Sequence, residues 1–383
     1  MPSPKPDRLL FVDNLRWLMI VLVVTMHAAV TFSGLGSWYY VEQGKLDTGS
    51  LLVFAFYQTH LQAFFMGFLF LIAGYFVPGA FERKGTRKFI ADRAVRLGVP
   101  TLIYVVIVQP AVGYYLCHAP GSGPLPSLWT VCRHYFFSLR FLGGTGPMWF
   151  ALALLIFCIA YPGVQRLLGS RETGQRDAPL PGHAAVAGLI GLITVGAFLI
   201  RVVQPIGTSV LNMQLCFFTQ YVVLFAVGTI AWHRNWLARL PHGLGVFWLW
   251  LAVVVGPLLW AGMMLAGGGR AGNFEPYTGG WHWQSAAYCL WESFFCVGVC
   301  VGLLVVFRDR FDAQGRFTRF MSDNAFAVYV FHPPILIAIT FALRGPALPP
   351  LVKFVLASGL ATIACFLAAH YVFRRIPGLR RVL

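Results

Sequence analysis

Apolar segments of membrane length recur along the whole chain, and this repetition constrains the fold more than any other feature. A helix needs about 20 predominantly apolar residues to cross the hydrocarbon core of a bilayer. About ten segments reach that length, and they run over residues 9–31, 51–77, 97–117, 148–168, 184–203, 214–232, 244–265, 285–307, 325–343 and 351–373. Because lipid offers the backbone no hydrogen bonds, the sequence predicts an all-α, polytopic transmembrane helical bundle, forming one domain over residues 1–383.

The composition favours a membrane protein over a soluble one. Hydrophobic residues make up 58% of the chain and charged residues 11%, whereas soluble domains carry about 25% charged residues. In a membrane protein the formal net charge of +16 indicates topology and contact with anionic lipids or substrates. We therefore expect membrane lipids, and no nucleic acid, among the partners. The first apolar segment lacks a small-residue cleavage site, so we expect a retained helix.

Lysine and arginine residues are unevenly divided between the two sets of alternating loops. With the N-terminus in the cytoplasm, the cytoplasmic segments hold roughly three times as many of them as the opposite segments. The positive-inside rule then places both termini in the cytoplasm, and we expect a multi-pass protein of the cytoplasmic (inner) membrane. In this orientation Arg16 lies in the inner half of the membrane and His27 in the outer half.

The first apolar segment carries Asp13, Arg16 and His27. Ionisable residues are costly in hydrocarbon, so they are candidates for function. Arg16 and His27 are separated by nearly a whole number of helical turns, which places them on one face about 16 Å apart. Asp13 precedes Arg16 by one turn and can neutralise it. The alternative is that Asp13 and Arg16 form an interfacial pair whose side chains reach toward the headgroups.

The most basic loop ends in Arg93 and Arg96, just before the third apolar segment. Residues three apart on a helix share a face, and two guanidinium groups can bind phosphate oxygens in bidentate fashion. This pair therefore predicts a phosphate-bearing ligand at the cytoplasmic mouth. Ordinary positive-inside anchoring of the loop is the alternative.

Glu292 and His332 are further candidates inside apolar segments. Glu292 lies at a depth similar to that of His27, and a carboxylate beside a histidine would hold its tautomer. Alternatively, Glu292 is an interfacial residue or pairs with Arg201. His332 precedes two prolines, which free backbone carbonyls and bend a helix. His332 either lines a cavity or is a satisfied core residue, and the same two readings apply to His60.

The eight cysteines are scattered, without a pair or cluster at zinc-ligand spacing. We therefore expect no metal site and no permanently bound cofactor. Cys117 and Cys132 flank one loop, and they are able to form a disulfide if that loop is extracytoplasmic.

Several short motifs resemble the acyltransferase 3 family of integral membrane proteins, and they occur in that family's order. Asp13-Asn-Leu-Arg16 followed by His27 resembles its opening, and Arg93-x-x-Arg96 resembles its arginine pair. The remaining matches are Phe64-Phe65 through Ile72-Ala73-Gly74-Tyr75-Phe76, then Met148-Trp149-Phe150, then Asn324 through Tyr329-Val-Phe-His332-Pro333. Together they span most of the chain.

The terminal Arg375-Ile-Pro377-Gly-Leu and the Trp that follows Arg16 are similar to the glucan biosynthesis protein C subgroup, which adds succinyl groups to periplasmic glucans. Two positions depart from the family pattern. Ala73 stands where the family usually has Ser, and Trp17 stands where Gly is common. Any role of that serine hydroxyl does not carry over to this chain.

The resemblance implies a transferase that moves an acyl group from a cytoplasmic acyl-CoA-type donor to a hydroxyl of an extracytoplasmic carbohydrate. Arg93 and Arg96 would then bind donor phosphates, and the donor arm would pass along a polar seam beside Arg16. His27 would take the proton of the acceptor hydroxyl as general base. A transporter or flippase for an anionic envelope compound is the rival hypothesis, although such proteins often contain inverted repeats that this sequence lacks.

Overall fold

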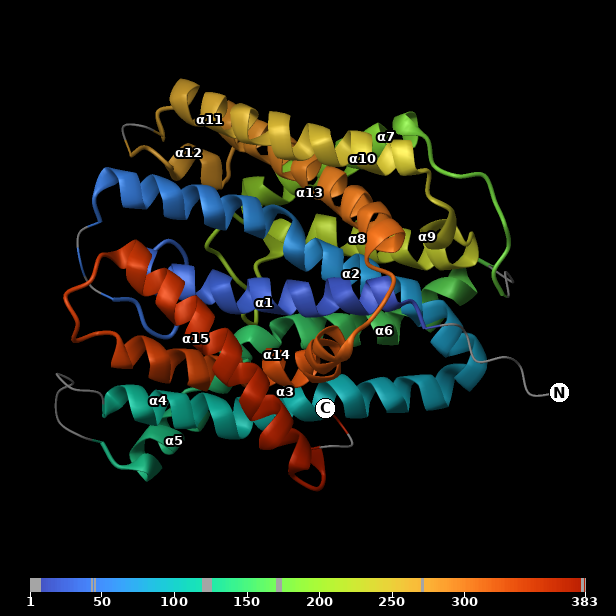
Figure 1. Cartoon of the computed structure of the whole chain (residues 1–383). Helices are drawn as coiled ribbons and strands as arrows, with labels where there is room; N and C mark the ends of the chain where they lie inside the picture. Colours follow the sequence, from blue (N-terminus) through green and yellow to red (C-terminus); the bar gives the residue numbers. More distant parts are fainter. Residues whose placement is uncertain are drawn as a thin grey trace.

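The computed structural model describes residues 8–42, 44, 46–118, 126–169, 174–269, 272–379 and 382. These residues form a bundle of long helices with short connections, shown in Figure 1. Within them the only β pairing is an isolated bridge between Val210 and Met213. The predicted all-α fold is confirmed. Some basic residues behind the orientation argument lie outside the described residues: Lys5, Lys45, Arg171, Arg270, Arg380 and Arg381.

The long helices follow the predicted apolar segments in order. They are α1 (Leu10–Ser33), α2 (Thr48–Arg93), α6 (Trp149–Leu167), α7 (His183–Val203), α8 (Phe218–His233), α13 (Trp283–Arg310), α14 (Arg316–Ala342) and α15 (Pro350–Tyr371). Two further segments are built from shorter pieces. One joins a π-helix (Ala94–Gly98), α3 (Val99–Ile103), a second π-helix (Tyr104–Val108) and α4 (Gln109–Cys117); the other joins α10 (His242–Trp250), a π-helix (Leu251–Val255) and α11 (Gly256–Ala266).

Nine helical stretches of the described residues are long and apolar enough to cross a membrane. One of them, Thr48–Cys117, is 70 residues long and contains two predicted segments. Its helix breaks at Gly85, where φ is 67° and ψ is 168°. Figure 1 shows the chain turning back near this point, so that α4 returns alongside the bundle. All of the predicted apolar segments are therefore present as helices, and the multi-pass membrane architecture is confirmed.

Helix α1 occupies a central position, with α2 on one side and α14 and α15 on the other (Figure 1). It also contacts α13. Its buried residues occur on more than one face, and Phe11, Val12, Leu15 and Met19 are almost fully buried. A helix that is apolar on all sides belongs in the interior of a bundle. Helix α1 therefore lies inside the bundle, with Asp13 and His27 partly buried and the Arg16 side chain 41% exposed.

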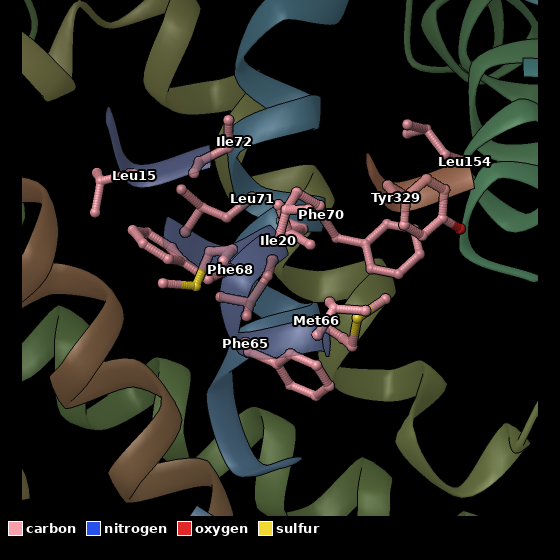
Figure 2. Packing of buried hydrophobic residues seen from close by; sticks show 14 of the residues in the cluster. Leu15, Ile20, Phe65, Met66, Phe68, Phe70, Leu71, Ile72, Leu154 and Tyr329 are labelled. Carbon is pink, nitrogen blue, oxygen red and sulfur yellow. The ribbon is translucent and has the colours of Figure 1, made fainter. Parts of the chain in front are cut away.

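Large side chains from α1 and α2 form much of the core. Figure 2 shows Ile20 of α1 among Phe65, Phe68 and Leu71 of α2, and Leu15 of α1 belongs to the same cluster. These side chains are less than one tenth exposed. Their dense packing holds α1 and α2 in a fixed rotation about their axes, which fixes the direction of the polar side chains on α1.

Glycines allow α2 and α8 to approach closely. A Cβ atom added at Gly74 would lie 2.2 Å from the carbonyl oxygen of Phe225, and one at Gly228 would lie 2.2 Å from that of Leu71. Small residues at a crossing are typical of membrane helices, because backbone contact replaces the hydrophobic driving force. This close crossing holds α2 against α8, while α2 also packs against α1.

Candidate active site

Two histidines from opposite parts of the chain meet beside α1. The imidazole rings of His27 on α1 and His332 on α14 are nearly parallel, with 3° between their planes and 5.3 Å between their centroids. The indole of Trp38, in the loop after α1, stacks on His27 with a centroid distance of 3.9 Å. His332 has no exposed surface, and His27 is half-buried. The two histidine candidates therefore form one site.

The sequence around His332 fixes which of its nitrogens carries a proton. In a regular helix the N–H of residue 333 would donate to the carbonyl of Tyr329, but Pro333 has no N–H. That carbonyl instead accepts a hydrogen bond from His332 Nδ1, with a separation of 2.9 Å. Since a carbonyl only accepts, Nδ1 is the protonated nitrogen of the neutral ring. His332 Nε2, which is buried without a partner, therefore presents a free lone pair.

The loop after α1 brings two aromatic side chains over the histidines. The backbone N–H of Glu42 donates to the carbonyl of Thr31 at 2.8 Å, so the loop folds back on α1. The Glu42 carboxylate also accepts a hydrogen bond from Lys353 Nζ of α15 at 2.6 Å, and this lysine is 4% exposed. A buried ion pair and a backbone hydrogen bond thus hold the segment that carries Trp38.

Tyr39, next to Trp38, joins this loop to the third membrane segment. Its hydroxyl lies 2.7 Å from that of Tyr104 and donates to Gln109 Oε1 at 2.5 Å. Burial raises the pKa of the Tyr39 phenol above its ordinary value, so the hydroxyl stays neutral at physiological pH. A Cβ atom at Gly146 would lie 2.2 Å from the Tyr39 hydroxyl, so only glycine fits this approach.

Arg16 lies at the other end of the same face of α1. Its Nη1 is 3.5 Å from Asp13 Oδ1, and its guanidinium lies 4.7 Å from the ring centroid of Phe76. Asp13 also pairs with Arg8 at 2.5 Å. The predicted contact between Asp13 and Arg16 is confirmed. Asp13 is shared by Arg8 and Arg16, and Arg8 also pairs with Asp323 at 3.7 Å, so the positive charge of Arg16 is only partly neutralised.

Arg93 and Arg96 add to that charge, since both lie near enough to Arg16 to repel its guanidinium. The helix is not regular here: Arg93 is the last residue of α2, and Arg96 belongs to the π-helix that follows. Single π-helical turns are frequent at functional sites. The three arginines form what we call the basic mouth, defined as Arg16, Arg93 and Arg96. A polyanion is its natural ligand.

The face of α1 between the basic mouth and the histidines is closed by apolar side chains. Ile20, Val23 and Val24 lie between Arg16 and His27 and are 8%, 3% and 0% exposed. The seam that we expected to be polar beside Arg16 is therefore apolar between Arg16 and His27, because packing against α2 and α14 fills this layer. The site consists of two polar ends separated by an apolar layer about 16 Å long.

Glu292 does not contribute to the histidine site. Its Oε2 is 2.5 Å from Arg201 Nη2 of α7, and both side chains are almost completely buried. The predicted contact between Glu292 and His27 is wrong, and the alternative pairing with Arg201 is confirmed. The physical reason is that a buried arginine needs a counter-ion, and α13 packs against α7 so that Glu292 supplies it.

The remaining candidates lie elsewhere. His60 Nδ1 donates to the carbonyl of Phe56 at 2.8 Å, and its ring is packed against Trp260 and Trp291, away from His27. Cys117 and Cys132 are both free thiols, so the disulfide considered for their loop is not formed. Within the described residues no group of three or more metal-ligating side chains occurs.

Trp38 and Tyr39 are the site residues that sequence reasoning missed. They lie in a short connection, where no periodicity reveals burial or direction. The available signal was compositional: the run Gly34-Leu-Gly-Ser-Trp-Tyr-Tyr40 places three aromatic residues directly after an intramembrane histidine. Aromatic residues in a loop only eleven to thirteen residues beyond a candidate base therefore indicate a contribution to its site.

One family model matches almost the whole chain. It is described as an acyltransferase domain, and it covers residues 9–370, from just before α1 into α15. The match includes both the basic mouth and the histidine site. No curated protein and no solved structure matches the chain.

Proposed function

Since the chain belongs to the acyltransferase 3 family of integral membrane enzymes, we propose that it transfers an acyl group from cytoplasmic acyl-CoA to a hydroxyl of an extracytoplasmic carbohydrate or envelope glycan. The observation that carries this proposal is the pairing of His27 with His332 at one end of α1 and the three-arginine basic mouth at the other. An enzyme that transfers an acyl group from a polyanionic donor to a hydroxyl needs positive charge to bind the donor and a base to accept the proton of the hydroxyl.

The basic mouth suits the phosphates of coenzyme A. Guanidinium groups bind phosphate oxygens through paired, charge-assisted hydrogen bonds. Beyond the phosphates the donor extends a slender, uncharged arm that contains two amide groups and ends in the thioester. To reach His27, this arm has to displace Ile20 and Val23 from their packed positions, and an apolar layer accepts it more readily than a charged one. The closed layer also keeps water away from the thioester.

At the outer end, His27 acts as the general base. Its imidazole takes the proton of the acceptor hydroxyl while the hydroxyl oxygen attacks the acyl carbonyl carbon. A carbon–oxygen bond forms, the carbon–sulfur bond breaks, and the proton passes from His27 to the departing thiolate. His332 Nε2, with its free lone pair, accepts a hydrogen bond from the acceptor and orients it. Two adjacent imidazolium ions would repel each other, so the pair carries at most one positive charge.

Orientation supports an acceptor outside the cytoplasmic membrane. The positive-inside distribution places the basic mouth on the cytoplasmic side, where acyl-CoA is made, and the histidines toward the opposite side. The resemblance to the glucan biosynthesis protein C subgroup makes a succinyl group and a glucan the first donor and acceptor to examine.

The test is an assay of purified protein in lipid nanodiscs. With succinyl-CoA and a glucan acceptor, we expect free thiol to be released and the glucan to gain the mass of a succinyl ester. The same preparation sealed into liposomes tests the rival transporter hypothesis. Movement of the intact compound without ester formation would contradict the proposal.

A further inference from the structure

We propose that Trp38 is a positioning residue that stabilises the protonated form of His27, and this inference rests on the proposed function of His27 as a base. The indole and imidazole planes are 12° apart, with centroids separated by 3.9 Å. The indole centroid of Trp38 is 6.1 Å from that of His332, so His27 is the closer of the two histidines to this ring.

The stack gains an electrostatic attraction only when His27 takes a proton. A neutral imidazole on an indole gains packing alone, whereas an imidazolium is attracted by the negative face of the aromatic ring. Tryptophan provides the strongest such attraction among the aromatic side chains. A base that is charged only during the reaction is therefore stabilised at the moment when the acceptor proton arrives.

Other groups around α1 do not compensate for this charge. Glu292 on α13 is paired with Arg201, and Glu42 in the loop after α1 is paired with Lys353. On α2 the hydroxyl of Tyr57 pairs with Thr25 at 2.6 Å. His332 on α14 is the titratable group that interacts with His27, and its effect is repulsive. Among the described residues the face of Trp38 thus supplies the favourable interaction.

The loop is built to hold the indole in place. Glu42 is tied to Lys353 and to the backbone of α1, while Tyr39 is tied to Tyr104 and Gln109. Before Trp38 in the sequence, the carbonyl of Leu35 accepts a hydrogen bond from Gln58 Nε2 at 3.1 Å, so the loop is held on both sides of Trp38. A side chain that is fixed from both sides loses little conformational entropy when it stacks.

The first measurement is the protonation midpoint of His27, which does not depend on activity. The protein contains ten histidines, and the carbon-13 signal of His27 in labelled protein is identified by its disappearance in His27→Gln. We expect the midpoint to fall in the order wild type, Trp38→Phe, Trp38→Leu, with a total change of roughly 0.5 to 1.5 pH units. Trp38→Phe keeps a buried ring and serves if Trp38→Leu does not fold.

Trp260→Leu is the matched control. Trp260 is buried, has an unpartnered Nε1 like that of Trp38, and lies 5.7 Å from His60 instead of His27. We expect its substitution to leave the midpoint of His27 unchanged. An unchanged or raised midpoint in both Trp38 variants would overturn the inference.

The pH dependence of acyl transfer then separates this inference from the proposed function. If both hold, the acidic limb of the kcat/KM profile moves to lower pH by the same amount as the midpoint of His27. A shifted midpoint with an unshifted limb would support the stabilising contact and remove His27 from the role of base.

Discussion

His27 and His332 face each other as parallel rings with centroids 5.3 Å apart, although they come from the first membrane helix and the last but one. The packing of α1 against α14 creates this relationship. The two nitrogens available for chemistry are therefore brought together by tertiary structure, and the proline after His332 decides the tautomer of one of them.

The first prediction concerns the base itself. His27→Asn should abolish acyl transfer, because asparagine hydrogen-bonds but accepts no proton at neutral pH. General base catalysis is worth about 10²- to 10⁴-fold, so the residual rate is expected to be very low. The measurement is ester formation by purified protein at matched membrane abundance. Near-normal transfer by this variant would move the role of base to His332.

The tautomer argument predicts an effect of Pro333→Ala. Alanine restores the N–H that competes with His332 Nδ1 for the carbonyl of Tyr329, so the ring loses its fixed tautomer. We expect kcat to fall about tenfold, which corresponds to one hydrogen bond of about 1.4 kcal/mol. Pro334→Ala is the control, since it restores the N–H to a different carbonyl. Equal losses in both variants would point to helix bending instead.

Donor binding should depend on the basic mouth. We expect Arg93→Ala and Arg96→Ala each to raise the KM for acyl-CoA about ten- to hundredfold, since a charge-assisted hydrogen bond is worth about 1.5–3 kcal/mol. The KM for the acceptor should change little. Arg87→Ala removes an exposed charge from the same end of α2 and is the matched control. The assignment fails if Arg87→Ala has the same effect, or if acceptor use declines equally.

Glu292 should matter for stability and not for chemistry. Glu292→Gln leaves Arg201 buried without a counter-ion, and breaking such a pair typically costs about 3–5 kcal/mol. The unfolding temperature in detergent is expected to drop, while the double variant Arg201→Leu/Glu292→Leu recovers part of the loss. A stable Glu292→Gln protein that is inactive would return this carboxylate to the catalytic candidates.

The orientation has its own test. We expect a reporter that is active only in the cytoplasm to be active when fused to the C-terminus, because the positive-inside rule places that end there. Insertion of the same reporter between residues 346 and 347, in the connection before α15, should leave it inactive. The reverse pattern would invert the topology and place the basic mouth outside.

The sequence by itself determined the helices, their order and the candidate polar residues. Lipid permits only helices and closed barrels, so apolar segments of sufficient length specify the secondary structure without reference to partners. For the same reason a histidine or arginine inside such a segment is conspicuous. Helical periodicity also placed Asp13, Arg16 and His27 on one face, because that relationship is local and depends on a single helix.

Tertiary structure decided which of these residues meet. Depth matching suggested Glu292 as a neighbour of His27, but depth says nothing about rotation around the bundle, and α13 turns this carboxylate toward Arg201. The position of Trp38 depends on a loop whose path is set by distant contacts with Lys353 and Tyr104. Non-local pairing and loop geometry follow from the packing of whole helices, which no single segment encodes.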